Sequence, residues 1–436
     1  MALFRTLGES RRALLRTLAC LAVVLGSPAL RAGEVEVLHY WTSGGEAKSL
    51  AELKASMAAR GHTWKDYTVV GGGGQAAMDA LKTRVVAGHP PAAALIKGPA
   101  IQEWADLGVL TNLDAMAEFD KWDDSLPRVI SDQMKSRGHY VAVPVNVHRV
   151  NWIWANASVL KKAGITKLPQ SYDELFAAAD KIRSIGIIAL AHGGQDWQDF
   201  TVFESVALGV GGASFYKDAF VKLDRAALSG DKMRKTLETF RRLKAYTDPQ
   251  SVGRDWNAAT AMVIKGQAGF QFMGDWAKGE FLAANQVAGT DFLCFAAPGT
   301  AQAFTYNVDS FAMFQLKGWD AQKAQGYLAY LIMGREFQEQ FNLRKGSIPA
   351  RLNLDLSKFD ECAKTSSKDF VASSAAGTLV PSVAHGMAVA PATQSSMRAT
   401  VSDFWNNDQL TVDATLARLA AVTNPVSKTR LAASGK

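Results

Sequence analysis

The sequence predicts an α/β protein built from two domains. Strand-like and helix-like runs alternate along the chain, beginning within the first hundred residues. Roughly 400 residues remain beyond an N-terminal leader, which is more than one hydrophobic core ordinarily holds. No internal repeat and no low-complexity linker divides the chain. Strand-like crossings rather than a flexible tether are therefore expected to join the domains, and this geometry favours a hinge with a cleft between two lobes.

The leader is the segment 1–32, which has the pattern of a secretory signal peptide. Four arginines precede an apolar run over 18–25, and small residues offer cleavage after Ala29 or Ala32. The run is too short to span a bilayer as a helix, although a membrane anchor is the alternative. The residues before Cys20 fit a lipoprotein signal poorly. We expect a soluble periplasmic protein that begins at residue 30 or 33.

Removing the leader changes the charge of the chain. The full sequence has a formal net charge of +7, but its first 32 residues hold five Arg and one Glu. The remaining chain has 43 basic and 40 acidic residues, a net charge of +3. No Lys/Arg cluster remains in it, so we expect no nucleic-acid partner.

The first domain opens with a βαβαβ pattern. Alternating or continuous apolar runs predict strands, and a 3.6-residue repeat predicts helices. The expected strands are 35–41, 67–70 and 92–96, and the expected helices are 46–60 and 75–86. Such alternation predicts a parallel sheet covered by helices.

The second domain begins after a strand-like run over 140–144. Another strand-like run covers 151–154. Ser171 with Glu174 three residues later forms a capping box, which predicts a helix start. Apolar repeats predict further helices over 231–246 and 320–341.

Two cysteines, Cys294 and Cys362, remain beyond the leader. Disulfides persist in the compartments that exported proteins enter, so we expect these residues to be bonded and to close a loop of 68 residues. Two free buried thiols are the alternative.

Several motifs of enzymes and metal sites are missing from the sequence. The run Gly71–Gly74 lacks the Gly-Lys-Ser/Thr of a phosphate-binding loop, so we interpret it as a tight turn before a helix that starts at Gln75. His148 and His192 lack metal-ligand spacing and are expected to be structural. No Gly-x-Ser-x-Gly elbow occurs. Paired glycosidase carboxylates have no local motif, so that class stays open.

Polar and aromatic residues follow the predicted strands at their carboxyl ends, where open parallel sheets bind ligands. Segment 40–46 follows the first strand and Lys97 follows the third. Segments 274–276 and 307–310 flank later apolar runs, and 345–347 ends a helix. Each segment alone is an ordinary loop. Together they suit a sugar, whose apolar faces stack on aromatic rings and whose hydroxyls need donors and acceptors.

In this order and spacing the chain resembles the solute-binding proteins of bacterial carbohydrate ABC transporters, and more narrowly their glucose/mannose-binding branch. The stretches that carry the resemblance are 38–46, 86–91 with Lys97-Gly98, 274–277 and 345–349. The resemblance covers essentially the whole mature chain. It implies the two-lobed periplasmic-binding-protein fold, with hinge strands and a ligand cleft.

The resemblance also implies where the lobes begin and end. The N-terminal lobe is expected to comprise 33–145 plus 310–350, and the C-terminal lobe 146–309 plus 351–436. The chain is expected to cross between them near 145–149, near 309–311 and again after Pro349.

By the same resemblance, ten residues are expected to contact the ligand. They are Tyr40, Trp41, Glu46, Gln75, Lys97, Trp276, Asn307, Asp309, Lys345 and His385. Gln75 is the weakest of these, and His385 rests on the resemblance alone. Many relatives have a second tryptophan where this chain has Tyr40. We expect Trp41 and Trp276 to sandwich a sugar from opposite lobes.

The expected function is capture of a monosaccharide, most simply glucose, and its delivery to the permease subunits of an ABC transporter. We expect a monomer that needs no cofactor or metal and is not an enzyme. The alternatives are a secreted glycan-active enzyme and a chemosensory sugar-binding module with the same fold.

Overall fold

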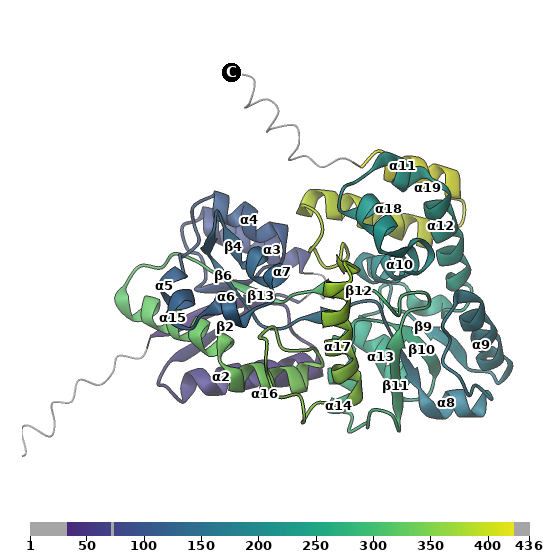
Figure 1. Ribbon diagram of the computed structural model, residues 1–436, viewed down its shortest axis with the longest axis horizontal. Helices are drawn as coiled ribbons and strands as arrows, with labels where there is room; N and C mark the ends of the chain where they lie inside the picture. Colours follow the sequence, from purple (N-terminus) through teal and green to yellow (C-terminus); the bar gives the residue numbers. More distant parts are fainter. Residues whose placement is uncertain (1–32, 71–73, 423–436) are drawn as a thin grey trace, which may run out of the picture.

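The computed structural model describes residues 33–70 and 74–422. The expected signal peptide and the turn at Gly71–Gly73 lie outside the described residues. The chain forms two lobes that lie side by side, with β12 (Phe304–Asn307) and α17 (Glu361–Ala375) between them (Figure 1). The predicted two-lobed α/β fold is confirmed.

The first lobe is built on a five-stranded sheet in the order β2-β1-β3-β13-β6. Strand β1 pairs in parallel with β2 and β3, as the βαβαβ pattern predicts, while β13 runs antiparallel to β3 and β6. The strands are β1 (Glu34–His39), β2 (Thr63–Thr68), β3 (Ala93–Leu95), β6 (Ala142–Pro144) and β13 (Ser310–Met313). The helices are α2 (Gly44–Ala58), α3 (Gln75–Val86), α4 (Pro99–Asp106), α5 (Asp114–Phe119), α6 (Trp122–Ser125), α7 (Arg128–Ser131), α15 (Trp319–Met333) and α16 (Arg335–Lys345).

The second lobe is built on a four-stranded sheet in the order β11-β8-β10-β9. The strands are β8 (Trp152–Asn156), β9 (Ile188–Ala191), β10 (Ala268–Phe272) and β11 (Phe292–Ala296). The helices are α8 (Ala157–Lys162), α9 (Tyr172–Ser184), α10 (Asp196–Phe220), α11 (Arg225–Ser229), α12 (Asp231–Lys244), α13 (Trp256–Ile264), α14 (Lys278–Ala283), α18 (Pro391–Asn406) and α19 (Val412–Ala420). The expected capping box is present, because the Ser171 hydroxyl and the Glu174 carboxylate bond each other's backbone N–H groups.

A small third sheet lies where the lobes meet. It has the order β14-β12-β7, with β7 (His148–Arg149) antiparallel and β14 (Leu379–Pro381) parallel to β12. The chain passes through it each time it moves between the two large sheets, first between β6 and β8 and then between β11 and β13. The remaining short elements are β4 (Lys135–Ser136), β5 (His139–Tyr140), η1 (Asp132–Met134), η2 (Pro249–Ser251) and η3 (Asp275–Ala277).

Two of the departures from the sequence-based expectation have a clear physical reason. The single helix expected over 320–341 is two helices, because Gly334 has extended backbone angles and caps α16 after ending α15. Helix α10 was not predicted at all. Every residue from Trp197 to Leu208 in it is buried, so its sequence shows no polar face and no helical period.

No helix among the described residues has the length and apolar character that crossing a membrane requires. Cys294 on β11 and Cys362 on α17 form a disulfide in the structure, with their Cα atoms 6.0 Å apart. The bond ties an edge strand of the second lobe to the helix that lies between the lobes.

The disulfide has a measurable consequence for stability. Replacing both cysteines with serine is expected to lower the free energy of unfolding by about 4 kcal/mol in the chain-entropy model, because the loop closed by the bond spans 68 residues. Denaturant unfolding of the oxidised protein and the double variant measures the difference. Thiol titration of the unfolded, unreduced protein should find no reactive cysteine beyond the leader, and two reactive thiols would contradict the bond.

Candidate functional site

A small cavity lies between the two lobes, beside the crossing strands. Its volume is about 30 Å³, enough for two or three water molecules by the rule that each needs about 10–15 Å³. We call it the central cavity. It is lined by Tyr40, Trp41, Glu46, Lys97, His148, Trp197, Trp256, Trp276, Asn307, Asp309, Lys345 and His385.

Nine of the ten residues that the sequence singled out line the central cavity. The tenth, Gln75, is the first residue of α3 and lines a larger neighbouring cavity instead. The fold thus brings together segments from 40 to 385 of the chain. That these residues contact a ligand stays a prediction.

One wall of the cavity is held by Glu46 and Lys345. Glu46 is the third residue of α2, where its carboxylate completes a capping box with Ser43. Its other oxygen, Oε1, accepts a hydrogen bond from Lys345 Nζ at 2.9 Å. Lys345 is the last residue of α16, which ends because Gly346 adopts a left-handed conformation with φ of 92°. Two helix ends therefore fix this ion pair.

Asp309 lies at the floor of the cavity, between β12 and β13. Its Oδ1 lies 2.8 Å from Lys97 Nζ, and its Oδ2 accepts bonds from Asn146 Nδ2 and His148 Nε2, each at 3.0 Å. Burial alone would raise the pKa of Asp309, but the charges of Lys97 and His148 outweigh it and hold that pKa well below the ordinary value. Asp309 is therefore ionised at neutral pH.

His148 extends this network toward the second lobe. Its Nδ1 hydrogen-bonds Asp275, whose other oxygen accepts the backbone N–H of Arg149 at 2.9 Å. Burial would lower the pKa of His148, but Asp275 and Asp309 outweigh it and raise that pKa. Both ring nitrogens are thus donors to carboxylates, as in an imidazolium.

Aromatic rings line the cavity from both lobes. The Trp41 ring packs edge-on against Phe311, with ring centres 5.6 Å apart. The Trp276 ring lies 4.7 Å from the His385 ring and 6.4 Å from the Trp197 ring. Trp41 and Trp276 are each at least 94 % buried, so both also serve as core residues of their own lobes.

His385 stands on a loop that a buried carboxylate organises. Glu204 on α10 accepts hydrogen bonds from Ser382 Oγ at 2.6 Å and from Val383 N at 2.8 Å. It also accepts from the Tyr216 hydroxyl at 2.8 Å. Burial lowers the pKa of the His385 ring well below its ordinary value, and the nearby Lys97 and His148 add to that effect. The ring is therefore neutral.

Sequence reasoning missed three residues of the lining: His148, Trp197 and Trp256. His148 is buried and ion-paired, as expected of a structural histidine, yet it also lines the cavity. His192 pairs with Asp199 and does not line it. Trp197 belongs to the unpredicted helix α10, and Trp256 begins α13 after an irregular loop. Trp197 follows β9 after a short turn, but the sequence analysis predicted no strand there, and Trp256 follows no strand directly, so the strand-end rule gave no signal for either tryptophan.

The site balances charge around a small polar space. Among the described residues no group of three or more His, Cys, Asp or Glu side chains could hold a metal ion. Three carboxylates meet three cations, as the pairs Asp309 with Lys97, Glu46 with Lys345, and Asp275 with His148. An environment of paired charges and indole rings can hydrogen-bond a neutral polyhydroxyl compound, because it offers both donors and acceptors.

Comparison with known proteins places the chain among relatives. Residues 47–331 match the family model described as bacterial extracellular solute-binding protein. The chain is 45% identical to a probable sugar-binding periplasmic protein of Rhizobium meliloti (strain 1021), covering 94% of this chain and 99% of that protein. A protein of the same description from Brucella suis biovar 1 (strain 1330) is 44% identical, covering 93% and 96%.

Solved structures share the fold. A chitin oligosaccharide binding protein superposes with a TM-score of 0.74 at 19% identity, covering 90% of this chain and 98% of that one. At that identity the likeness concerns the fold alone.

The loop that carries His385 yields a pH-dependent prediction. Burial raises the pKa of Glu204 from 4.5 to about 7, although its hydrogen bonds partly oppose the shift. At pH values between these two pKa values, Glu204 is protonated in the folded protein and ionised in the unfolded chain. The free energy of unfolding should therefore fall as pH rises from about 5 to 7, by about 3 kcal/mol from this group.

The isosteric variant Glu204→Gln should lose that part of the pH dependence. Urea unfolding of both proteins at several pH values measures it. Parallel stability curves for the two proteins would contradict the assignment.

Proposed function

The chain belongs to the bacterial extracellular solute-binding protein family, and we propose that it captures a neutral aldohexose, glucose in the first instance, in the periplasm. It then delivers the sugar to the permease subunits of an ABC transporter. The observation that carries the proposal is the central cavity itself, where ion pairs and tryptophans from both lobes converge. The names of its relatives support a sugar as the ligand.

The charge pattern favours a neutral ligand. Each carboxylate of the site is already matched by a cation, so an anionic or cationic ligand would leave one charge unbalanced in a buried space. Hydroxyl groups can donate to the carboxylates and accept from the ammonium groups. Asn307 Oδ1 is buried without a hydrogen-bond partner among the described residues, and a sugar hydroxyl would supply the missing donor.

Stacking accounts for the aromatic lining. A pyranose ring has two faces that expose C–H groups, and indole rings pack well on such faces. Trp41 comes from the first lobe and Trp276 from the second, and both line the central cavity. We propose that they sandwich the sugar, with Tyr40 beside them, so that one ligand contacts both lobes.

Binding requires the lobes to move. The central cavity has room for only a few water molecules, so in this proposal the lobes separate to admit the sugar and close on it. The hinge comprises the crossings at 145–149, 309–311 and beyond Pro349, which divide the lobes at 145/146, 309/310 and 350/351. Closure excludes water and strengthens the charged hydrogen bonds. The closed shape is what the permease subunits recognise.

The ion pairs argue against a glycosidase at this site. Such enzymes need one carboxyl group that holds a proton near neutral pH and one that acts as base or nucleophile. Asp309 has a pKa held well below the ordinary value, so it cannot donate a proton. Glu46 is engaged by the start of α2 and by Lys345.

Titration calorimetry with glucose, galactose, mannose and maltose tests the ligand class. We expect glucose to bind with one site per chain, because the site matches one pyranose between its two tryptophans. Incubation with oligosaccharides should release no new reducing ends. Binding of none of these sugars would overturn the proposed ligand, and turnover would favour the glycan-active enzyme.

Closure can be tested through one glycine contact between the lobes. Gly45 at the start of α2 donates its N–H to Glu280 Oε1 on α14 at 2.7 Å. A Cβ atom at Gly45 would lie 2.7 Å from the backbone carbon of Gly279. Gly45→Ala should therefore hinder closure and weaken sugar binding about tenfold or more, since binding is coupled to the closed state.

Gly44→Ala is the matched control, because its Cβ meets only the Glu280 carboxylate at 3.6 Å. Both variants should keep the melting temperature of the unliganded protein, as alanine suits a helical position better than glycine. Calorimetry gives the affinities, and small-angle scattering gives the sugar-induced compaction. Equal affinities for the two variants would contradict the closure model.

A further inference from the structure

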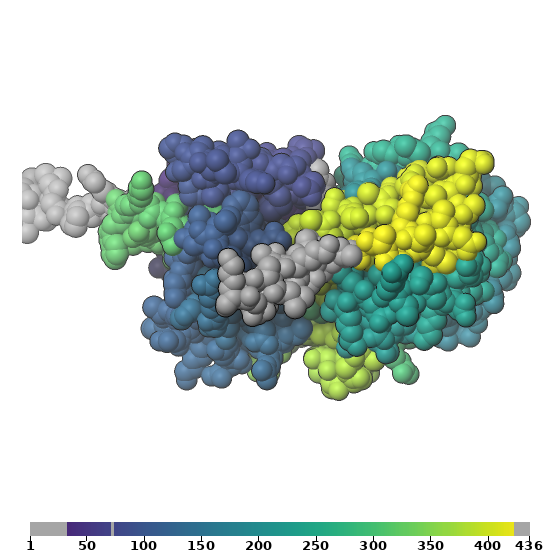
Figure 2. All heavy atoms as spheres, turned by 90° about the horizontal axis from the view of Figure 1, so that it is seen from above, coloured from purple at the N-terminus to yellow at the C-terminus, as the bar shows by residue number. Residues whose placement is uncertain are grey.

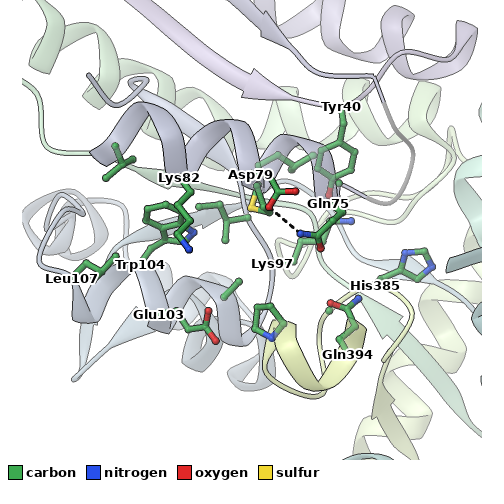
Figure 3. A pocket seen from close by; sticks show the side chains of 18 of the residues that line it. Tyr40, Gln75, Asp79, Lys82, Lys97, Glu103, Trp104, Leu107, His385 and Gln394 are labelled. Carbon is green, nitrogen blue, oxygen red and sulfur yellow. Dashed lines mark hydrogen bonds between the residues drawn. The ribbon is translucent and has the colours of Figure 1, made fainter. Parts of the chain in front are cut away.

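A second and much larger cavity opens beside the central cavity. Its volume is about 590 Å³, and it shares Tyr40, Lys97 and His385 with the smaller space. We call it the side cavity. It lies between helices α3 and α4 of the first lobe and the start of α18 of the second (Figure 3). A ligand held in the central cavity therefore has room to extend past these three shared residues.

One part of the side cavity is apolar. Trp104 on α4 is half-buried, and its ring packs edge-on against Phe314 with ring centres 5.7 Å apart. Met78, Val85 and Leu107 also line the cavity. Trp104 contributes an indole ring to this lining, and the flat face of that ring is a surface on which a sugar ring could stack.

Polar side chains face the same space. Gln75, Asp79 and Lys82 are spaced i, i+4 and i+7 along α3, which places them on one face of that helix. Glu103 comes from α4, and Gln394 comes from α18 across the lobe boundary (Figure 3).

Two of these polar side chains make no contact with another charged or polar group among the described residues. The side chains of Lys82 and Glu103 are exposed, and neither has a hydrogen bond or an ion pair to another described residue, although both line the cavity. Partial burial raises the pKa of Glu103. An ammonium and a carboxylate are thus available to a ligand that can both accept and donate hydrogen bonds.

We propose that the side cavity binds a second sugar residue, linked glycosidically to the hexose in the central cavity, so that the ligands of this protein include disaccharides. The proposal rests on the proposed function, because it needs a hexose in the central cavity. A second pyranose would stack one C–H face on Trp104 and hydrogen-bond Lys82 and Glu103 through its hydroxyls. An aryl group in this position would stack on the Trp104 indole but would form no hydrogen bonds with Lys82 and Glu103.

Seen from above, the yellow C-terminal segment reaches from the second lobe toward the purple and blue helices of the first lobe (Figure 2). At the inner boundary Gly98 and Gly386 pack closely, because a Cβ on Gly98 would lie 2.4 Å from the Gly386 carbonyl oxygen. The lobes thus touch at this point while the side cavity stays open beyond it. A second sugar residue can therefore remain bound when the lobes are closed.

Calorimetry of the full chain tests the proposal with glucose, glucosyl disaccharides of several linkages, and the methyl and phenyl glucosides. We expect at least one disaccharide to bind as tightly as glucose or more tightly. Trp104→Ala should weaken that disaccharide about tenfold through lost stacking and leave glucose within about twofold. Glu103→Gln should also weaken only the disaccharide, and it tests the site without disturbing the Trp104 packing.

Trp319→Ala is the matched control, because Trp319 is a 72% exposed tryptophan on α15 that does not line the side cavity. It should change neither affinity. Glucose binding together with disaccharide affinities at least a hundredfold weaker would overturn this inference and leave the proposed function intact. If the phenyl glucoside bound more tightly than the methyl glucoside while no disaccharide bound tightly, the side cavity would take an apolar substituent instead of a second sugar residue. If Trp104→Ala lost as much affinity for glucose as for the disaccharide, the role of Trp104 would be structural. If no sugar bound at all, the proposed function itself would be overturned.

Discussion

Asp309 carries a buried negative charge at the point where the chain passes from β12 to β13, and its neutralisation holds several elements in place. Lys97 reaches it from the end of β3, and His148 reaches it from β7. Burying a carboxylate is costly unless cations and hydrogen-bond donors surround it. Asn146 completes the shell, since its amide donates to Asp309 Oδ2 and its oxygen accepts the Asp309 N–H. The crossing strands are thereby fixed relative to one another.

The same charge organises the wall of the central cavity. His148 is held between Asp309 and Asp275, and the Trp276 ring lies edge-on to the imidazole with ring centres 5.2 Å apart. Because Asp275 begins the short helix that carries Trp276, the orientation of this tryptophan depends on a charge more than thirty residues away. The network thus links Lys97, which follows β3 in the first lobe, to Asp275 of the second lobe through Asp309 and His148 beside the crossing strands.

Local patterns in the sequence predicted the elements whose two faces differ. The βαβαβ start was found because its apolar residues repeat with a strand or helix period, and the helix that follows Ser171 was found from its capping box. Helix α10 has no such period, since its first twelve buried residues meet other elements on every side. The break at Gly334 was missed because the apolar repeat continues through it.

The lining of the central cavity was predictable where a strand led into it. Trp41 and Lys97 follow β1 and β3, so the rule for the carboxyl ends of parallel strands pointed to them. His385 follows β14 only after a loop whose shape depends on Glu204, and those two residues are 181 positions apart. Physical reasoning from local sequence cannot connect them, so this histidine was named from the family resemblance. Trp197 had neither signal, because neither β9, which it follows, nor α10, which it begins, was predicted from the sequence.

A ligand can drive closure of the lobes only if it binds the closed form more tightly than the open form. Moving a population from 1% closed to 99% closed requires a difference of about 5.5 kcal/mol. A hydrogen bond to a charged group contributes about 1.5–3 kcal/mol, so two or three such bonds formed only on closure would suffice. Glu46 and Lys97 lie on the first lobe, while His385 and Trp276 lie on the second. A hexose that touches only one of these sets would bind equally to both forms and would leave the equilibrium unchanged. In the proposed mechanism, the division of the contacts between the lobes is therefore what allows a small neutral molecule to select the closed shape.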